Sequence, residues 1–356
     1  MKQLARIAAL LIAGAALAAC SGMNQNVTPA AGPGAMAPAV THAGSPAKWE
    51  IKGDIREIAA HINPGHPHFF VPRFRNKNVF ANTAPVGYPF DMTCQKPSSK
   101  GACTVMNGAT AYNIYVSADG KKCKTESCWG NPEEFLKALT GSPLAGIAKQ
   151  YTGAGADKFK FGGSTSVTEA PAFNYPWLTY YNADLFTILL QGVQQLKVIP
   201  TGNTEFHIFL PPGADTCFDQ TGSCYSPDNL SSFAFCAYHN SIMYQGVPII
   251  YSVEPYQNAQ ITYQGKKLYG CQDANVPAGT NRLDSGTAST LLHESQESWS
   301  DPAPGTGWVN DYSGGEEVGD VCAYVFMDQF KLGSETYFMQ QIYSNHAHGC
   351  ASTAKQ

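Results

Sequence analysis

The chain has 356 residues, of which only 14% are charged and 12% are aromatic. Together with 34 glycines and 23 prolines, this composition is typical of a turn-rich globular protein and excludes a largely disordered chain. The formal net charge of −4 and the lack of any run of like charges give no reason to expect a nucleic-acid partner.

Residues 1–19 have the pattern of a signal peptide. Lys2 and Arg6 form a basic start before an apolar run over 7–19, which is shorter than the about 20 residues of a membrane-spanning helix. The run ends in Leu-Ala-Ala-Cys, which resembles a bacterial lipobox. The resemblance implies cleavage before Cys20 and lipidation of this cysteine, and the serine that follows it implies sorting to the outer membrane, on its periplasmic or cell-surface face. The alternative is an ordinary secretory signal with a chance cysteine.

Two segments follow that lack a regular pattern. Residues 20–46 are rich in Ala, Gly, Pro, Thr and Ser, as in a flexible tether between a lipid anchor and a domain. Residues 47–105 are expected to form an irregular N-terminal segment, which holds His61, His66 and His68. Three histidines in eight residues could bind a metal, but a surface loop is the favoured interpretation because prolines break the cluster.

Cysteine usage agrees with export. Of the 11 cysteines, ten remain when Cys20 is set aside, and an even number in an exported chain indicates disulfides. Short loops predict the pairs Cys94–Cys103, Cys123–Cys128 and Cys217–Cys224. Two longer links, with connectivity left open, are expected among Cys236, Cys271, Cys322 and Cys350. A cysteine-ligated zinc site is disfavoured because the chain has no CxxC pair.

The segment 106–356 alternates strand and helix patterns. Predicted strands cover 111–117, 204–210, 232–239 and 247–253, and a further strand begins at 158–161. Predicted helices begin at Asn131-Pro132, around Pro143 and at Asn182, the last ending at Lys197. We therefore expect one α/β or α+β domain, a mixed sheet with packed helices stapled by disulfides. The lack of GxSxG, Walker and GxGxxG patterns removes support for serine-hydrolase and nucleotide-binding functions.

The rest of this domain is organised around a predicted helix over 284–300, which contains the array HESQE. Asp284 or Ser285 can cap its start, and an Asp-Pro pair ends it. His293 and Glu297 are four residues apart, so they lie on the same face of a helix. This is the ligand spacing of the HExxH zinc-protease helix, with the second histidine replaced by glutamate.

The predicted helix has two faces. The apolar face, expected to pack in a core, carries Ala288, Leu291, Leu292 and Trp299. The polar face, available for chemistry or water, carries Thr290, His293, Glu294, Glu297 and Asp301. An ordinary amphipathic helix with a solvated polar face is the alternative interpretation.

An acidic cluster follows the helix at a distance typical of metalloproteases. Zinc needs a third protein ligand besides His293 and Glu297, and either Glu317 or Asp320 can supply it, with Glu316 as a neighbouring alternative. A zinc ion is expected, with Ca²⁺ or Mn²⁺ as alternatives because the ligand set is rich in oxygen.

Glu294 is the candidate general base, turned about 100° around the helix from His293. His239 could line the site, although a core or surface role is favoured.

These motifs resemble the EXORDIUM-like, phosphate-induced protein family. The resemblance rests on HESQESWSDP, the Gly307-Trp308 pair, GGEEVGDVCAY and C-terminal positions around Tyr337, Ser344-Asn345 and Gly349-Cys350, and it covers roughly 110–350. It implies a secreted protein with a zincin-like metal helix but no settled enzymatic activity. The matching motif residues are His293, Glu294, Glu297, Glu317, Asp320 and Cys322. Ser295 and Ser298 depart from the apolar or alanine positions of the family.

The sequence thus predicts a lipid-anchored, zinc-dependent metallopeptidase that acts on a peptide or another cell-envelope substrate outside the cytoplasm. The alternative is a non-catalytic envelope protein with a structural metal or a role in carbohydrate interaction. Trp308, Tyr312 and Tyr324 are the aromatic residues that could stack on sugars.

Overall fold

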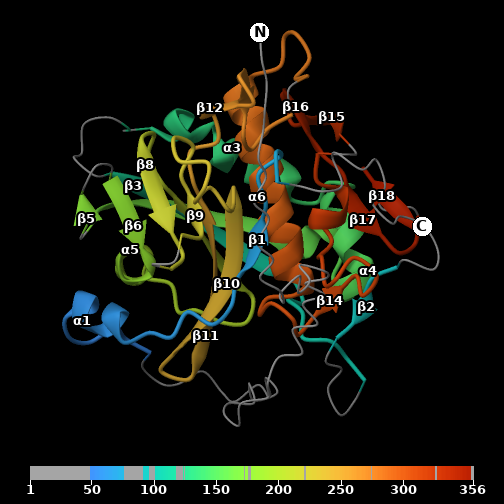
Figure 1. Ribbon diagram of the computed structural model, residues 1–356. Helices are drawn as coiled ribbons and strands as arrows, with labels where there is room; N and C mark the ends of the chain where they lie inside the picture. The colour runs from blue at the N-terminus through green and yellow to red at the C-terminus, as the bar shows by residue number, and fades with distance from the viewer. Residues whose placement is uncertain are drawn as a thin grey trace, which may run out of the picture. The chain divides into compact units, whose positions relative to one another are not determined.

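A six-stranded mixed sheet forms the centre of the fold in the computed structural model (Figure 1). The strands occur in the order β1 (His68–Phe70), β10 (Ala237–Tyr244), β11 (Val247–Glu254), β7 (Thr204–Phe209), β3 (Ala109–Ser117) and β4 (Phe159–Thr168). The pairs β11–β7, β7–β3 and β3–β4 are parallel, whereas β1–β10 and β10–β11 are antiparallel. The predicted mixed sheet is therefore confirmed.

The structure describes residues 49–75, 91–95, 101–117, 123, 125–171, 173–174, 178–219, 222–273, 275–324 and 327–353. All of them belong to the unit His42–Gln356. The expected signal peptide, the lipobox Cys20 and the tether lie outside the described residues. Among the residues that the structure describes, no helix is long and apolar enough to cross a membrane.

Three helices cover the two faces of the sheet. α5 (Asn182–Leu196) packs on the face that carries Ile114, Val116 and Ile208, as expected from its apolar pattern. It approaches β3 closely at Gly192, where a Cβ atom would collide with the side chain of Ile114. α6 (Arg282–Ser300) and α3 (Pro132–Leu139) pack on the other face, which carries Ala111, Tyr115, Phe209 and Ile250.

The remaining elements surround this centre. The other helical turns are α1 (Ile55–Ala60), η1 (Glu126–Trp129), η2 (Ala145–Ala148), α4 (Lys149–Thr152), η3 (Ala156–Lys158) and η4 (Asp320–Cys322). A second sheet contains β5 (Phe173–Asn174), β6 (Leu178–Tyr181), β8 (Ala214–Cys217) and β9 (Cys224–Tyr225). Four two-stranded sheets pair β2 (Thr93–Cys94) with β14 (Trp308–Val309), β12 (Gln260–Tyr263) with β13 (Lys266–Tyr269), β15 (Met327–Leu332) with β16 (Glu335–Gln340), and β17 (Ile342–Ser344) with β18 (Gly349–Ala351).

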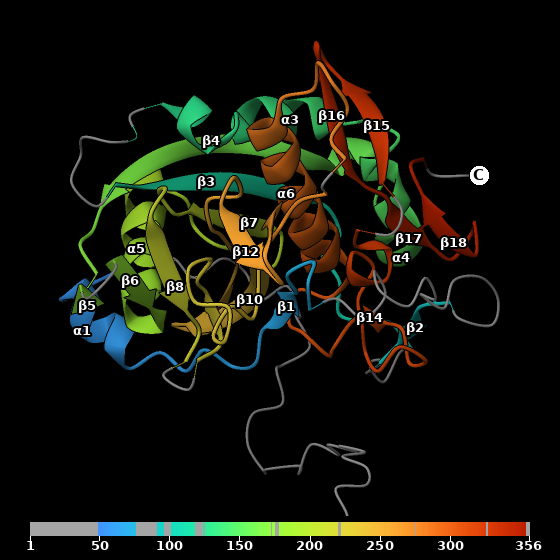
Figure 2. The same cartoon turned by 45° about the horizontal axis from the view of Figure 1, so that its top comes forward.

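The later elements gather around α6. In Figure 1, α6 runs beside β10 and β1, and the strands β15 to β18 lie on its other side. Figure 2 shows the same helix next to the strands of the central sheet. The contacts of α6 reach β10, β11, β16 and α3. This helix therefore lies between the central sheet and elements that follow it in the chain.

Two sequence expectations differ from the structure. The segment 47–105 is not wholly irregular, because α1 and β2 form in it and β1 joins the edge of the central sheet. The strand expected at 232–239 begins later, at Ala237, and continues to Tyr244. Gln245 and Gly246 both have positive φ, as in a two-residue type I′ hairpin, and this turn fixes where β10 and β11 pair.

Five cysteine pairs lie at disulfide distance and include all three predicted local pairs. The local disulfides are Cys94–Cys103, Cys123–Cys128 and Cys217–Cys224. The two longer links, which the sequence left open, are Cys236–Cys271 and Cys322–Cys350. The second of these begins in η4, the turn that carries Asp320.

Candidate metal centre

The helix α6 holds the HESQE array, and a side-chain cap fixes its start. It begins at Arg282, because the side chain of Asn281 accepts hydrogen bonds from the backbone N–H groups of Leu283 and Asp284. The expected caps, Asp284 and Ser285, therefore lie inside the helix. Ser285 Oγ instead accepts a hydrogen bond from the N–H of Phe338 in β16.

The apolar face of this helix packs in the core as predicted, but its polar face is not exposed to water. Every side chain from Ser285 to Ser300 is buried, so the polar face is enclosed as well. A row of polar residues on the sheet faces it. This row pairs in register across five strands and consists of His68, His239, Ser252, His207 and Asn113.

Gln340 fixes the protonation of His293. Gln340 Nε2 donates to the carbonyl oxygen of Gly319 at 2.9 Å, so its Oε1 faces His293 Nδ1 at 3.2 Å. An amide oxygen only accepts hydrogen bonds, and Nδ1 must therefore carry the proton. Nε2 faces Glu297 Oε1 at 3.0 Å and Asp320 Oδ1 at 3.4 Å. Burial would lower the pKa of His293, but the charge of Glu297 and the hydrogen bond to Asp320 raise it well above its ordinary value, so Nε2 also carries a proton in the metal-free protein.

Glu297 receives its orientation from the turn before η4. Its Oε1 accepts from the N–H groups of Gly319 at 3.2 Å and Asp320 at 3.1 Å. Burial would raise the pKa of Glu297, but the positive charge of His293 outweighs it and lowers this pKa below the ordinary value. Glu297 is thus held as a carboxylate next to Nε2 of His293.

Asp320 and Glu317 reach a further histidine. His68 Nδ1, on β1, lies 2.8 Å from Asp320 Oδ2 and 3.2 Å from Glu317 Oε2. Burial would lower the pKa of His68, but the charges of Asp320 and Glu317 raise it to about 10. Burial would raise the pKa of Asp320, and His68 and His293 lower it strongly instead.

Glu294 lies against His239 of β10. His239 Nε2 donates to the backbone carbonyl of Asp301 at 3.0 Å, so Nδ1 faces Glu294 Oε2 at 3.3 Å and Glu297 Oε2 at 3.5 Å. Burial raises the pKa of Glu294 to about 7, against the lowering effect of its hydrogen bond to His239. One proton between His239 Nδ1 and Glu294 Oε2 satisfies both groups.

The ligand atoms converge in two groups that could hold a metal ion. The atoms of each group lie within 4.8 Å of one another. The first group is His68, Glu297, Glu317 and Asp320, and the second is His239, Glu294 and Glu297. Of the residues that the sequence singled out as ligands, Glu297, Glu317 and Asp320 are in the first group, and His293 contacts two of these carboxylates. Glu316 lies apart, where its backbone pairs with Asn310.

Several buried atoms of these groups and of the neighbouring His293 have no hydrogen bond with suitable angles among the described residues. They are His68 Nδ1, His293 Nε2, Glu294 Oε1, Glu297 Oε2 and both carboxylate oxygens of Glu317. Their ion-pair distances are short, but hydrogen-bond geometry is not met, and buried polar atoms without partners are rare in native proteins. A metal cation between these atoms, in place of the protons on the histidines, would satisfy them.

Two histidines of these groups are not among the ligands that the sequence predicts. The sequence favours a surface loop for His68 and a core or surface role for His239. In the structure His68 joins the centre, whereas His61 and His66 of the same segment are exposed. His239 is fully buried, as in a core role, and also lines the centre. Alternation of side chains along a strand shows which face each histidine shares. Only the pairing of β1 with β10 places His68 and His239 side by side on the face covered by α6.

A second buried polar layer continues from the centre along the sheet. His207 Nδ1 and Ser252 Oγ are 2.8 Å apart, and Ser252 Oγ donates to Glu254 Oε1 at 2.8 Å. Glu205 Oε2 accepts from Trp299 Nε1 at 3.0 Å. Burial raises the pKa values of Glu205 and Glu254 to about 8 and lowers that of His207 to about 3. These three groups are therefore uncharged at neutral pH.

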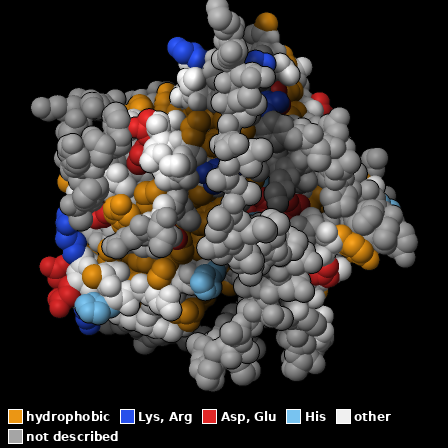
Figure 3. All heavy atoms as spheres, viewed as in Figure 1, with side chains coloured by type: hydrophobic (Ala, Val, Ile, Leu, Met, Phe, Trp, Pro, Cys, Tyr) orange, Lys and Arg blue, Asp and Glu red, His pale blue; other side chains and the backbone are white. Residues whose placement is uncertain are grey.

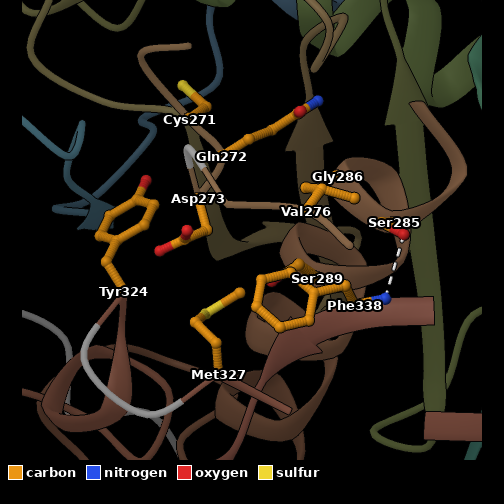
Figure 4. A pocket seen from close by; sticks show the side chains of 10 residues that line it. All are labelled: Cys271, Gln272, Asp273, Val276, Ser285, Gly286, Ser289, Tyr324, Met327 and Phe338. Atoms are coloured by element: carbon orange, nitrogen blue, oxygen red, sulfur yellow. Dashed lines mark hydrogen bonds between the residues drawn. The ribbon is translucent and has the colours of Figure 1, made fainter. Parts of the chain in front are cut away.

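His68 is the ligand with the greatest access to solvent. Its side chain is 31% exposed, whereas those of His239, His293, Glu294 and Glu297 are 0% exposed. A small pocket beside α6 lies elsewhere, between Gln272, Ser285, Ser289 and Tyr324 (Figure 4). On the face shown in Figure 3, charged side chains are scattered and do not gather in one patch.

No protein-family model matches the sequence, and no curated protein or solved structure is detectably similar to it. The resemblance to the EXORDIUM-like family therefore stays a prediction.

Proposed function

We propose that this chain is an exported, zincin-like metalloprotein that hydrolyses peptide bonds, with a zinc ion bound by His293, Glu297 and Asp320. The observation that carries the proposal is the orientation of the His293 ring. Gln340 holds the proton on Nδ1, so Nε2 is the nitrogen that faces two carboxylate oxygens, at 3.0 and 3.4 Å, and that a metal can bind. These three atoms require a positive charge between them, which a proton on Nε2 supplies in the metal-free protein and which a metal ion would supply in its place.

The neighbouring residues suit hydrolysis. A bound zinc ion would lower the pKa of a water molecule and polarise the carbonyl group of a substrate. Glu294 follows His293 in the helix and has a pKa raised to about 7, close to the value at which a general base works best near neutral pH. His239 positions Glu294 Oε2 through the contact at 3.3 Å. Oε1 of Glu294 accepts no hydrogen bond from the described residues, which leaves it available to take a proton.

The cellular setting is part of the proposal. The N-terminal pattern and lipobox support export and lipid attachment at Cys20, in the outer membrane. The five disulfides support an oxidising compartment. The substrate is then a peptide bond in the cell envelope or its surroundings.

A structural metal is the second candidate, and burial favours it. Glu294, Glu297 and both inner histidines are fully buried, and a substrate would have to approach from the side of His68. In this alternative the same ligands bind the ion, which stabilises the fold without reacting.

Metal analysis combined with a peptidase assay tests both candidates. We expect bound zinc in the wild type, its loss in His293→Asn, and its retention in Glu294→Gln with a fall in peptidase activity of about 10²–10⁴-fold. Bound metal without activity in the wild type would favour the structural candidate. A wild type that stays metal-free after zinc reconstitution would exclude both.

A further inference from the structure

A further set of ligand atoms lies on the solvent side of the His293–Glu297 pair. His68 Nδ1 is 2.8 Å from Asp320 Oδ2 and 3.2 Å from Glu317 Oε2. Together with Glu297, these residues form the larger of the two convergent groups. They come from different parts of the chain, since His68 lies on the edge strand β1 and the two acids lie at η4.

Asp320 connects this set with the zinc ligands. Its Oδ1 lies 3.4 Å from His293 Nε2, and its Oδ2 lies 2.8 Å from His68 Nδ1. A carboxylate whose two oxygens face two different histidines has the arrangement of a bridging ligand. Such ligands are found in two-metal hydrolases, whose ions lie about 3.5–4 Å apart.

Glu317 provides an independent observation. Its carboxylate is 1% exposed, and neither oxygen accepts a hydrogen bond from the described residues. Both oxygens point to histidines, with Oε2 at 3.2 Å from His68 Nδ1 and Oε1 at 3.8 Å from His239 Nε2. A buried carboxylate without hydrogen-bond donors requires either a proton or a cation beside it.

The charges of the whole cluster point the same way. The described ion pairs of Glu294, Glu297, Glu317 and Asp320 are all with histidines, and none involves a lysine or arginine. One divalent ion compensates two of the four negative charges that these carboxylates carry when ionised. A second divalent ion compensates the other two.

We propose that His68, Glu317 and Asp320 bind a second divalent cation, which Asp320 bridges to the ion at His293 and Glu297. One imidazole and two carboxylates form a ligand set that suits Zn²⁺ or Mn²⁺. Because His68 is the exposed ligand, this ion lies on the side from which substrate approaches. It would help to orient the substrate carbonyl between the two ions. The inference rests on the proposed function for the first ion.

Metal stoichiometry of the full chain, loaded with Zn²⁺ and dialysed, tests the second site. We expect two equivalents in the wild type and one equivalent in both His68→Asn and Glu317→Gln. His66→Asn, an exposed histidine two residues from His68, is the matched control and should retain two. Circular dichroism and melting temperature check that each variant is folded. The wild type loaded with Mn²⁺ needs no variant and should show the electron paramagnetic resonance spectrum of a coupled Mn²⁺ pair.

The two proposals fail in different ways. One equivalent in the wild type that is lost in His293→Asn but kept in His68→Asn would overturn the second site and leave the proposed function standing. One equivalent that is lost in His68→Asn but kept in His293→Asn would overturn the first site and with it the two-ion centre. An uncoupled Mn²⁺ spectrum at full loading would also overturn the second site.

Discussion

At the scale of single residues, Gln340 determines which nitrogen of His293 is free to bind a metal. We predict that Gln340→Ala lowers zinc affinity by about 10–100-fold, as expected when the partner that orients a ligating histidine is lost. Gln341→Ala, at the half-buried neighbouring position, is the control and should leave affinity unchanged. Competition with a chelating dye measures both. Equal affinities in the two variants would show that the Gln340 hydrogen bond does not orient the ligand.

The buried carboxyl group of Glu205 makes the free energy of unfolding depend on pH. Its pKa is raised to about 8 in the folded protein, against about 4.3 for an ordinary glutamate. The folded state therefore binds this proton more tightly, and the stability it contributes is complete below about pH 4 and is lost as the pH rises through about 8. We predict that Glu205→Gln is more stable than the wild type at pH 9 by on the order of 2–5 kcal/mol.

Urea unfolding at pH 5, 7 and 9 measures this effect. Glutamine keeps an acceptor for Trp299 Nε1, which bonds Glu205 at 3.0 Å, so the two proteins should differ little at pH 5. Parallel pH profiles for wild type and variant would contradict the raised pKa.

The sequence predicts those metal ligands that lie close together in the chain. His293 and Glu297 share a helical face at any tertiary arrangement, and acids shortly after a helix can return to it. His68 and His239 could not be predicted in the same way, because they meet only through the pairing of β1 with β10. His68 lies 225 residues before His293 by their sequence numbers, and no local pattern encodes such a contact.

At the scale of elements, the approach of η4 to α6 forms the centre. Gly319 makes this approach possible, because a Cβ atom there would lie 2.7 Å from His293 Cγ and Nδ1 and 2.8 Å from Glu297 Oε1. Its φ of −81° is available to any residue, so the requirement for glycine is steric and not conformational.

We predict that Gly319→Ala pushes η4 away from α6 and reduces both metal content and stability, the latter by about 1–3 kcal/mol. Gly202→Ala is the control, because nothing lies within 4 Å of a Cβ atom there. Metal analysis and urea unfolding measure the two effects. A Gly319→Ala protein with wild-type metal content would show that η4 can move without disturbing the ligands.

Most regular elements were predictable, whereas the edges of the sheet were not. The apolar pattern of α5 and the helix start at Asn131-Pro132 have local causes. β1 is three residues long, and long-range contacts hold it, namely the pairing with β10 and the stacking of Phe70 on His293. The register of β10 with β11 depends on a hairpin turn of Gln245 and Gly246 at the end of β10, a weaker turn signal than Asn-Gly.

At the scale of the whole molecule, the disulfide Cys322–Cys350 ties the turn that carries Asp320 to the C-terminal strands. The two cysteines are 28 residues apart, for which loop-closure entropy gives a stabilisation of about 3–4 kcal/mol. We predict that the Cys322→Ser, Cys350→Ser double variant loses this stability and binds metal more weakly. The corresponding Cys123, Cys128 variant, with a separation of 5, should lose less stability and keep its metal affinity. Calorimetry and chelator competition measure both properties.

Metal removal should destabilise the whole fold, and more so at high pH. Without a cation, protons on the histidines compensate the buried carboxylates. The pKa of His68 is raised to about 10, so its contribution is complete below about pH 6.5 and is lost as the pH rises through 10. The metal-free protein should therefore lose stability over this range, whereas bound metal, which replaces these protons, preserves it. Metal at 100 times its dissociation constant contributes about 2.7 kcal/mol.

We predict that EDTA lowers the free energy of unfolding only slightly at pH 6 and by about 2–4 kcal/mol at pH 8.5. Urea unfolding with and without EDTA measures the difference. Asp320→Asn is the control, because it removes the carboxylate that contacts both His293 and His68, and its stability should not respond to EDTA at either pH. An equal effect of EDTA on the wild type and on Asp320→Asn would place the stabilising ion at another site. If EDTA had no effect on the wild type at pH 8.5, the histidine and carboxylate cluster would be balanced by protons alone, and the enclosed polar face of α6 would have a structural role without metal.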